Sequence, residues 1–304
     1  MDFALQASGT YDDVLESARF AEKRGLVSLA LPDHYLLALD EEHAKTTPAL
    51  DAFAQLAGLA RETSTIELSV LVSPITFRHP AVLAKNAVTI DQMSGGRFSL
   101  GIGTGWMDRE HEVFGFEYPS TSERFEMLEE ALGYVKAALA DEPVGFNGKH
   151  YQLEAFPLAP KPTGTVKLIV GGTGAHKTPY LAGTYSDEYN IYPGPDLEER
   201  IERAHKAAED AGRDPNALLL SSAGFMLAAA TQDELNEALD ERASEAGMTR
   251  DELDEYHAHR NTPVGTYDEL RDQFAAMEQA GVTRFYFQGG LHPRNEALID
   301  ALSG

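Results

Sequence analysis

Short apolar runs and amphipathic stretches alternate along the whole chain. Val27–Leu31 is a short, mainly apolar run, as expected of a buried parallel strand. Tyr11–Arg24 instead repeats apolar side chains at three- to four-residue spacing and is followed by Gly25, which predicts a helix and its end. This alternation predicts strand–helix units and a parallel sheet.

The pattern predicts a repeated order of strands and helices from one end of the chain to the other. We expect strands at Phe3–Ala7, Val27–Leu31, Ile66–Ser73, Arg97–Gly103, Lys167–Val170, Glu188–Tyr192, Leu218–Leu227 and Arg284–Phe287. We expect helices at Tyr11–Arg24, Pro48–Arg61, Pro80–Met93, Ser122–Leu139, around Thr178–Gly183, and at Leu197–Ala211, Leu270–Ala280 and Arg294–Leu302. This arrangement fits a (β/α)8 TIM barrel of the α/β class better than an open Rossmann sheet.

Two segments do not fit the repeat. The segment 143–164 contains Asn147-Gly148 between aromatic residues, a pattern that favours a β-hairpin. The segment 231–259 is an additional acidic helical stretch. Insertions that follow strands lie at the C-terminal face of a barrel, so we expect both there, within one domain spanning residues 1–304.

The charge balance narrows the possible partners. The chain carries 49 acidic and 25 basic residues, a formal net charge of −24, which repels phosphate backbones and argues against nucleic-acid binding. Only nine of the basic residues are Lys. An acidic, Lys-poor surface predicts adaptation to a salt-rich cytoplasm, where screening shortens the range of charge repulsion.

Several sequence features predict a cytoplasmic protein that binds no membrane. No apolar run approaches the roughly 18 residues of a membrane-spanning helix. Met1–Ser8 reads as a strand and lacks the basic region of a signal peptide. The chain has no cysteine, which excludes disulfides, thiolate metal sites and thiol nucleophiles.

Catalytic groups of a barrel belong at the C-terminal ends of its strands, and four such ends carry unusual residues. The first is Asp33-His34, after the second strand. His34 could transfer a proton near neutral pH, and Asp33 could orient it or stabilise its charge. The alternative is an ordinary loop with a surface histidine.

The second end is Ser73-Pro74-Ile75, a rigid loop that by itself could be a plain connector.

The other two ends are rich in glycine. The first is Gly101–Trp106, which includes Thr104 and Gly105 and whose glycines could let a planar ligand approach the backbone. Trp106, the only Trp in the sequence, could line an apolar pocket. Gly171–Lys177 ends the fifth strand and could bind phosphate through backbone N–H groups and a Lys side chain. Its relevant residues are Gly171, Gly172, Thr173, Gly174 and Lys177. The alternative is a glycine-rich turn. The ten histidines include no HExxH motif, and the nearest pair, His257 and His259, lies in an acidic helical segment where we expect it to be solvated, so no metal site is predicted.

Taken together, these residues resemble the luciferase-like monooxygenase superfamily. The resemblance is carried by Thr89, Asp91, Ser94, Gly96, Arg97, Phe98, Leu100, Gly101, Gly103, Gly105, Trp106, Glu110, Phe114 and Gly115. Further matches are Arg78, Pro80 and Ala84, then Gly171-Gly172, and Pro263-Val264-Gly265-Thr266. Asp33-His34 is similar to the Asp-His pair of the branch that uses the deazaflavin coenzyme F420.

The resemblance implies a barrel that binds a deazaflavin or flavin at its C-terminal mouth. It implies that His34 lies by the reactive ring carbon and that Gly171–Lys177 holds the cofactor phosphate. It further places a cis peptide bulge at Ser73–Pro74, which we predict to be cis, and it favours a homodimer. Ala38 and Trp106 replace a Trp and a Glu of the sugar-phosphate-oxidising members, which argues against a glucose-6-phosphate substrate.

Three functional hypotheses follow. The first is an F420-dependent oxidoreductase that transfers a hydride between the deazaflavin and a small organic substrate, with His34 handling the accompanying proton. The second is an FMN-dependent monooxygenase on the same barrel. The third is a non-catalytic flavin-binding protein, which would bind cofactor without turnover.

Overall fold

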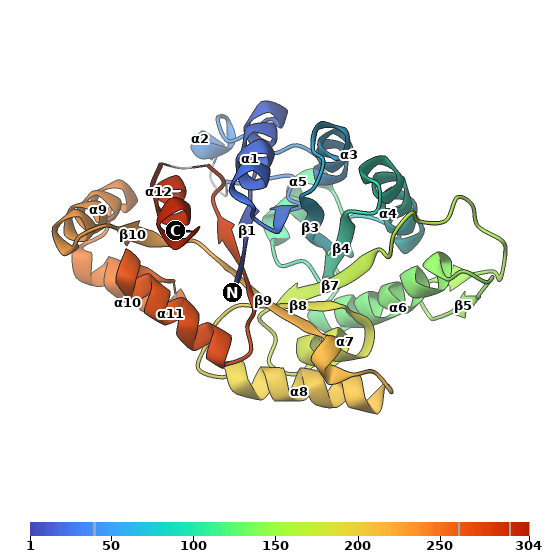
Figure 1. Ribbon diagram of the computed structural model, residues 1–304. Helices are drawn as coiled ribbons and strands as arrows, with labels where there is room; N and C mark the ends of the chain where they lie inside the picture. The colour runs from blue at the N-terminus through green and yellow to red at the C-terminus, as the bar shows by residue number, and fades with distance from the viewer. Residues whose placement is uncertain (39–40, 261, 292, 304) are drawn as a thin grey trace.

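The computed structural model describes residues 1–38, 41–260, 262–291 and 293–303 and contains a closed barrel of eight parallel strands (Figure 1). Around the barrel the strands follow the order β1, β12, β9, β8, β7, β4, β3, β2. They are β1 Asp2–Gln6, β2 Ser28–Leu31, β3 Glu67–Pro74, β4 Phe98–Gly103, β7 Lys167–Gly172, β8 Glu188–Ile191, β9 Leu219–Gly224 and β12 Arg284–Gln288. The predicted fold class is confirmed, and all C-terminal strand ends meet at one mouth.

Helices surround the barrel on its outside (Figure 1). The long ones are α1 Tyr11–Arg24, α3 Ala52–Glu62, α4 Pro80–Ser94, α6 Thr121–Leu139, α7 Lys177–Tyr185, α8 Leu197–Asp210, α11 Tyr267–Gln279 and α12 Pro293–Ser303. Shorter pieces are α2 Glu41–Ala44, α5 Asp108–Phe114 and the 3-10 turn Pro215–Ala217. Helix α3 begins after the predicted Pro48 because the side chain of Asp51 caps it by accepting from the Ala54 N–H.

The barrel interior is filled in layers. At its N-terminal end, Arg284 binds the buried Glu188 at 3.1 Å and the Tyr286 hydroxyl at 3.3 Å. Above this charged layer lies an apolar one, made of Ala4, Ala30, Leu71, Ile169, Ala223 and Tyr286. At the mouth, the interior becomes polar again with the paired Gln6 and Gln288. The barrel is therefore a packed core that is open to ligands only at its mouth.

The segment 143–164 forms the predicted hairpin, with β5 Phe146–Asn147 antiparallel to β6 Gln152–Leu153. Its expected position at the C-terminal face is wrong. The segment follows helix α6, not a strand, so it packs outside the barrel. Lys85 and Gln92 on α4 donate to the carbonyls of Ala159 and Lys161, which holds the segment along that helix.

The second insertion does follow a strand. The predicted strand Leu218–Leu227 is divided, because β9 ends at Gly224 and β10, Leu227–Ala229, leaves the barrel to pair with β11, Val264–Thr266. Helices α9 Gln232–Ala246 and α10 Arg250–Arg260 lie between these two strands in the chain. They share a small apolar cluster of Leu227, Ala229, Leu235, Ala238, Leu239, Ala243 and Leu253.

Strand β3 contains a bulge near the mouth. Its pairing register with β4 shifts between Val70 and Ser73, and the peptide bond between Leu71 and Val72 is cis. The prediction of a cis bond at Ser73–Pro74 is wrong, since that bond is not among the cis bonds of the described chain. Ser73 and Pro74 instead continue the ladder opposite Ile102 and Gly103, so the irregularity lies one residue pair earlier.

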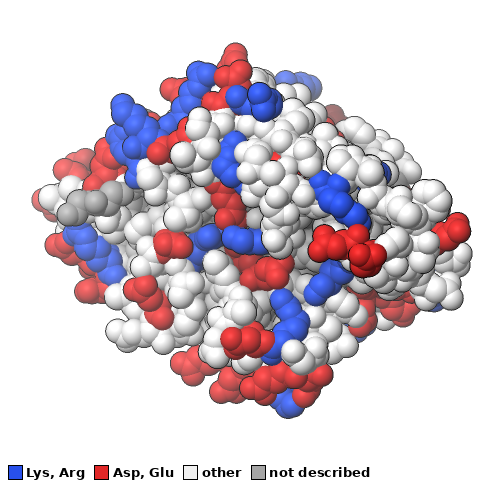
Figure 2. Space-filling model, turned by 45° about the vertical axis from the view of Figure 1, so that its right-hand side comes forward, with Lys and Arg blue, Asp and Glu red and all other residues white. Residues whose placement is uncertain are grey.

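The surface is strongly acidic. Figure 2 shows Asp and Glu side chains in scattered groups, mainly toward the edges of the visible face, with Lys and Arg among them. Many of the ion pairs join exposed side chains, such as Lys206 with Asp210, and pairs of this kind stabilise little. Within the described residues, no helix is both long and apolar enough to cross a membrane.

We expect the protein to need molar salt to fold fully, because its 24 excess negative charges repel one another at low ionic strength. Melting temperatures measured from low to molar KCl should rise by several degrees, and glucose at matched osmolality serves as the control. A flat melting temperature across the salt series would contradict the adaptation to salt.

Candidate active site at the barrel mouth

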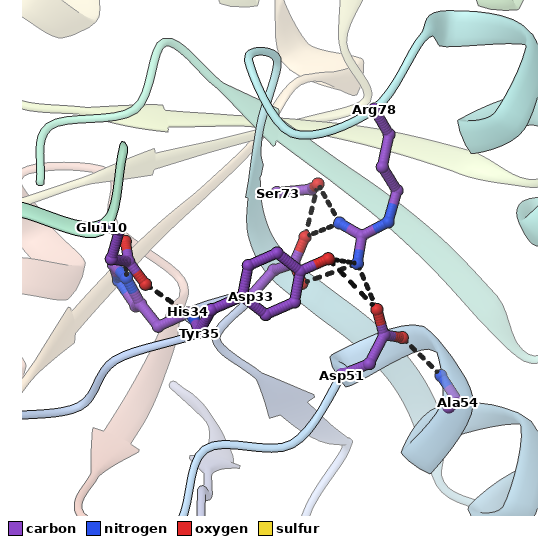
Figure 3. Close-up of polar contacts among 8 residues, drawn as sticks. All are labelled: Asp33, His34, Tyr35, Asp51, Ala54, Ser73, Arg78 and Glu110. Carbon is purple, nitrogen blue, oxygen red and sulfur yellow. Dashed lines mark hydrogen bonds and ion pairs between the residues drawn. The ribbon is translucent and has the colours of Figure 1, made fainter. Parts of the chain in front are cut away.

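His34 and Glu110 meet at the mouth from different elements (Figure 3). His34 follows β2 directly, and its Nδ1 lies 3.0 Å from Oε2 of Glu110 on the short helix α5. Glu110 is only 1% exposed. Its Oε1 accepts the backbone N–H groups of Tyr35 at 2.6 Å and Leu36 at 2.9 Å. The carboxylate is therefore fixed on both oxygens, and it fixes the imidazole in turn.

This contact defines what His34 can do. A carboxylate facing Nδ1 keeps a proton on that nitrogen, so Nε2 is the atom left to exchange a proton with a ligand. The side chain of His34 is 18% exposed, which leaves the ring partly accessible. Trp106 lies edge-on beside it, with ring centroids 5.8 Å apart. An imidazole oriented in this way can act as a general acid–base.

Asp33 points away from His34 into a separate polar network (Figure 3). Its fully buried carboxylate accepts from the Ser73 hydroxyl at 2.6 Å and from the guanidinium of Arg78. Burial raises the pKa of Asp33, while the Arg78 charge and the Ser73 hydrogen bond oppose that rise. Arg78 also binds Asp51 and the Tyr35 hydroxyl. The orienting contact to His34 that we considered for Asp33 is made by Glu110.

Sequence reasoning did not find Glu110 as the partner of His34. The two residues are 76 positions apart, and Glu110 lies on a helix that the periodicity did not predict. Its only signal was its place in the family signature. Arg78 was likewise quoted only as part of that signature, although it connects the loop after β2 to the cap of α3.

The other predicted residues after β3 and β4 lie around this pair. Ser73 contacts Asp33, and the buried Ile75 donates its N–H to the Gly103 carbonyl at 2.9 Å. Pro74 lies against Gly105, where an added Cβ would be 3.1 Å from the Pro74 Cβ. In the segment after β4, Thr104 is half-buried and Trp106 is 67% exposed at the edge of the mouth.

Glycines of β4 and β7 leave the space that the bulge in β3 occupies. A Cβ on Gly101 would lie 2.2 Å from the Val70 carbonyl oxygen, and one on Gly103 would lie 2.8 Å from a Val72 methyl group. Gly171 faces Val72 in the same way, at 3.2 Å. These glycines make room for a neighbouring strand, which differs from the ligand approach we expected of the Gly101–Trp106 segment.

The end of β7 leads into the first turn of α7. Gly172 has a positive φ of 151°, and a Cβ on Gly174 would lie 2.5 Å from the Thr178 hydroxyl, so this tight path needs glycine. Thr173 is exposed, and no side chain caps the helix. Lys177 is exposed, with its ammonium group 5.3 Å from the ring centre of Phe125. A helix start with these features can bind an anion.

A shallow cleft borders His34 on the side of β1. It is lined by Ala7, Ser8, Gly9, Leu31, Pro32, His34, Leu37, Ala49, Leu50 and Gln55. The cleft is small, and both polar and apolar groups line it. Among the described residues, no cluster of three His, Cys, Asp or Glu side chains could hold a metal ion.

A comparison with known protein families shows which family the chain belongs to. Residues 2–284 match the family described as luciferase-like monooxygenase. This chain belongs to the luciferase-like monooxygenase family. An oxidoreductase acting on a small molecule is what the family implies, and the signature residues described above lie within the matched range.

Individual members of the family show two kinds of similarity. The F420-dependent glucose-6-phosphate dehydrogenase of Kribbella flavida is 29% identical, over 94% of this chain and 90% of that protein. The pyrimidine monooxygenase RutA of Yersinia enterocolitica is 32% identical over 62% of this chain. The matched region spans about half, 52%, of the RutA protein.

Among solved structures, an F420-dependent secondary alcohol dehydrogenase in complex with an F420-acetone adduct has the same fold. Its TM-score is 0.79 at 23% sequence identity, covering 99% of this chain and 97% of that one. A flavin-type cofactor, either F420 or FMN, is consistent with these luciferase-like relatives.

Proposed function

We propose that the protein is an F420-dependent oxidoreductase that transfers a hydride between the deazaflavin and a small organic substrate. The observation that carries the proposal is His34, positioned by the buried Glu110 at the C-terminal mouth. The similarity to an F420-dependent dehydrogenase over 94% of the chain supports it. The deazaflavin would supply the hydride chemistry, and the protein would supply orientation and proton transfer.

The residues at the mouth fit such a cofactor. The start of α7 has no side-chain cap, so its backbone N–H groups are available to a phosphate, with Lys177 beside them. Gly171, Gly172, Thr173 and Gly174 form the tight backbone path that would lie beside the ligand. On the opposite side of β4, Ser73, Pro74 and Ile75 follow the bulge and would support the ring.

His34 would hold or release the proton that accompanies hydride transfer, at Nε2. Glu110 stabilises the imidazolium when that nitrogen is protonated and keeps the ring in one orientation. Asp33 would act as a positioning residue, because its bonds to Ser73 and Arg78 fix the backbone on which His34 sits. Trp106 would cover the site and limit the access of water.

A second candidate is an FMN-dependent monooxygenase, which the 32% identity to RutA favours. The two candidates differ in the cofactor they bind, and the third hypothesis, a non-catalytic flavin-binding protein, differs from both in showing no turnover.

A side-by-side titration with F420 and FMN is the direct test. We expect F420 to bind at least about tenfold more tightly, a difference of roughly 1.4 kcal/mol. Lys177→Ala should weaken F420 binding by several-fold through the lost charge on the phosphate, while Lys206→Ala, an exposed control on α8, should not. Tighter binding of FMN would favour the monooxygenase, and failure of both cofactors to bind would refute both enzyme candidates.

A further inference from the structure

A chain of hydrogen bonds crosses the interior of the barrel at its mouth. Gln6, the last residue of β1, donates its Nε2 to the Leu71 carbonyl of β3 at 2.6 Å. Gln288, the last residue of β12, donates its own Nε2 to the Gln6 Oε1 at 2.6 Å and to the Tyr192 hydroxyl at 3.2 Å. Tyr192 directly follows β8, so the hydrogen-bond network connects four strands, β1, β3, β12 and β8.

The Leu71 carbonyl fixes the direction of every hydrogen bond in this network. A backbone carbonyl can only accept, so Gln6 must turn its Nε2 toward Leu71 and its Oε1 toward Gln288. Gln288 must then present Nε2 to Gln6, and both hydrogens of that nitrogen are used by Gln6 and Tyr192. The amide orientation therefore follows from the network and needs no external ligand.

One acceptor and one donor remain unused at the Gln288–Tyr192 end of this hydrogen-bond network. The Oε1 of Gln288 accepts no hydrogen bond from the described residues. The Tyr192 oxygen accepts from Gln288, and the Tyr192 hydroxyl donates to none of the described residues, so its hydrogen can point toward a ligand. Tyr192 is 37% exposed and Gln288 is partly buried, whereas Gln6 beneath them is 7% exposed. An acceptor and a donor thus lie side by side on the accessible floor of the mouth.

We propose that Gln288 and Tyr192 form a ligand-binding pair that recognises the imide edge of a pyrimidinedione, an N–H next to a C=O. The N–H would donate to the Gln288 Oε1, and the carbonyl would accept from the Tyr192 hydroxyl. Both groups are neutral, which suits an uncharged imide better than a carboxylate or a phosphate. The pyrimidinedione is either the ring fused into a flavin or deazaflavin, which rests on the proposed function, or a separate substrate molecule.

The test compares Gln288→Met and Tyr192→Phe with the wild-type protein and with Gln232→Met, a control on the exposed face of α9. Dissociation constants are measured for F420, for FMN, and for uracil as a free pyrimidinedione, the last with and without cofactor. We expect Gln288→Met to weaken binding by about tenfold and Tyr192→Phe by several-fold, the effect of losing one hydrogen bond to a bound ligand. Circular dichroism checks that the variants are folded.

Each outcome separates one source from the other. If the edge belongs to the cofactor, the variants bind it more weakly, and methylation at the imide nitrogen weakens binding to the wild-type protein but not to Gln288→Met. If it belongs to a substrate, cofactor affinity is unchanged and only uracil binding falls. Unchanged affinity for all three ligands in folded variants overturns the proposal. If neither cofactor binds the wild-type protein, the proposed function fails, and uracil still tests the pair.

Discussion

Replacing His34 with Ala is expected to lower turnover by about 100-fold or more, the usual effect of losing a general acid–base, while cofactor affinity stays nearly unchanged. The imidazole contacts Glu110 and Trp106 at the mouth and caps no helix, so its loss removes proton transfer without removing a structural contact of the barrel. Turnover can be followed by absorbance at about 420 nm, the region of oxidised deazaflavin, with a substrate found by screening small alcohols and ketones.

Glu110→Gln separates proton transfer from positioning. The amide oxygen can still accept from Tyr35 and Leu36, but the amide NH2 group would then face Nδ1 of His34 and could not hold a proton there, so turnover should fall while cofactor affinity changes little. The exposed Glu112→Gln on the same helix is a matched control and should behave as wild type. Unchanged turnover in His34→Ala would remove His34 from the mechanism, whatever Glu110 does.

Replacing Arg284 with Met is expected to destabilise the fold by about 3–5 kcal/mol, because it leaves a buried carboxylate without its partner. Arg284 and Glu188 are 5% and 2% exposed and lie 3.1 Å apart in the charged layer of the barrel. Urea denaturation measures the change in the free energy of unfolding. Arg242→Met, at an exposed i,i+3 pair with Glu245, is the control and should change stability by less than about 1 kcal/mol.

The stability lost in Arg284→Met should depend on pH, and it should grow as the pH rises. Burial raises the pKa of Glu188 above its ordinary 4.5, and Arg284 opposes that rise. Without Arg284 the folded-state pKa rises further, so the folded protein takes up a proton more readily than the unfolded chain. Stability is then retained below about pH 4.5 and lost as the pH rises through the folded-state pKa. A double variant, Arg284→Met with Glu188→Gln, should recover part of the loss and remove this pH dependence.

Local signals were sufficient for the regular elements. The apolar spacing of Tyr11–Arg24 and the stop at Gly25 are properties of neighbouring residues, and the helix has the predicted bounds with Gly25 in the left-handed conformation. The barrel itself follows from repeating such units. The segment 143–164 was misplaced although its Asn-Gly hairpin was predicted. The predicted helix Ser122–Leu139 directly precedes it, so the predicted order of elements already placed the insertion after a helix, and the rule for insertions after strands did not apply to it.

The site depends on contacts between residues far apart in the chain, which no local pattern encodes. His34 was found because it ends a strand, but its partner Glu110 comes from a separate short helix. At Ser73–Pro74 the family resemblance implied a cis bulge, and the proline lowered the expected cost of a cis bond there. The actual irregularity at Leu71–Val72 is accommodated by glycines on two other strands, so its position is a tertiary property.

The packing of Val72 against Gly101, Gly103 and Gly171 makes these four positions interdependent in evolution. A methyl group at Gly101 meets backbone as well as side chain, so even a smaller residue at position 72 would not make that substitution tolerable. A substitution at one of these positions should therefore be tolerated only together with a change at another, so these parts of the three strands should diverge slowly. Mutant libraries aimed at new substrates are best directed at the rim around Trp106, where side chains can vary without disturbing the barrel.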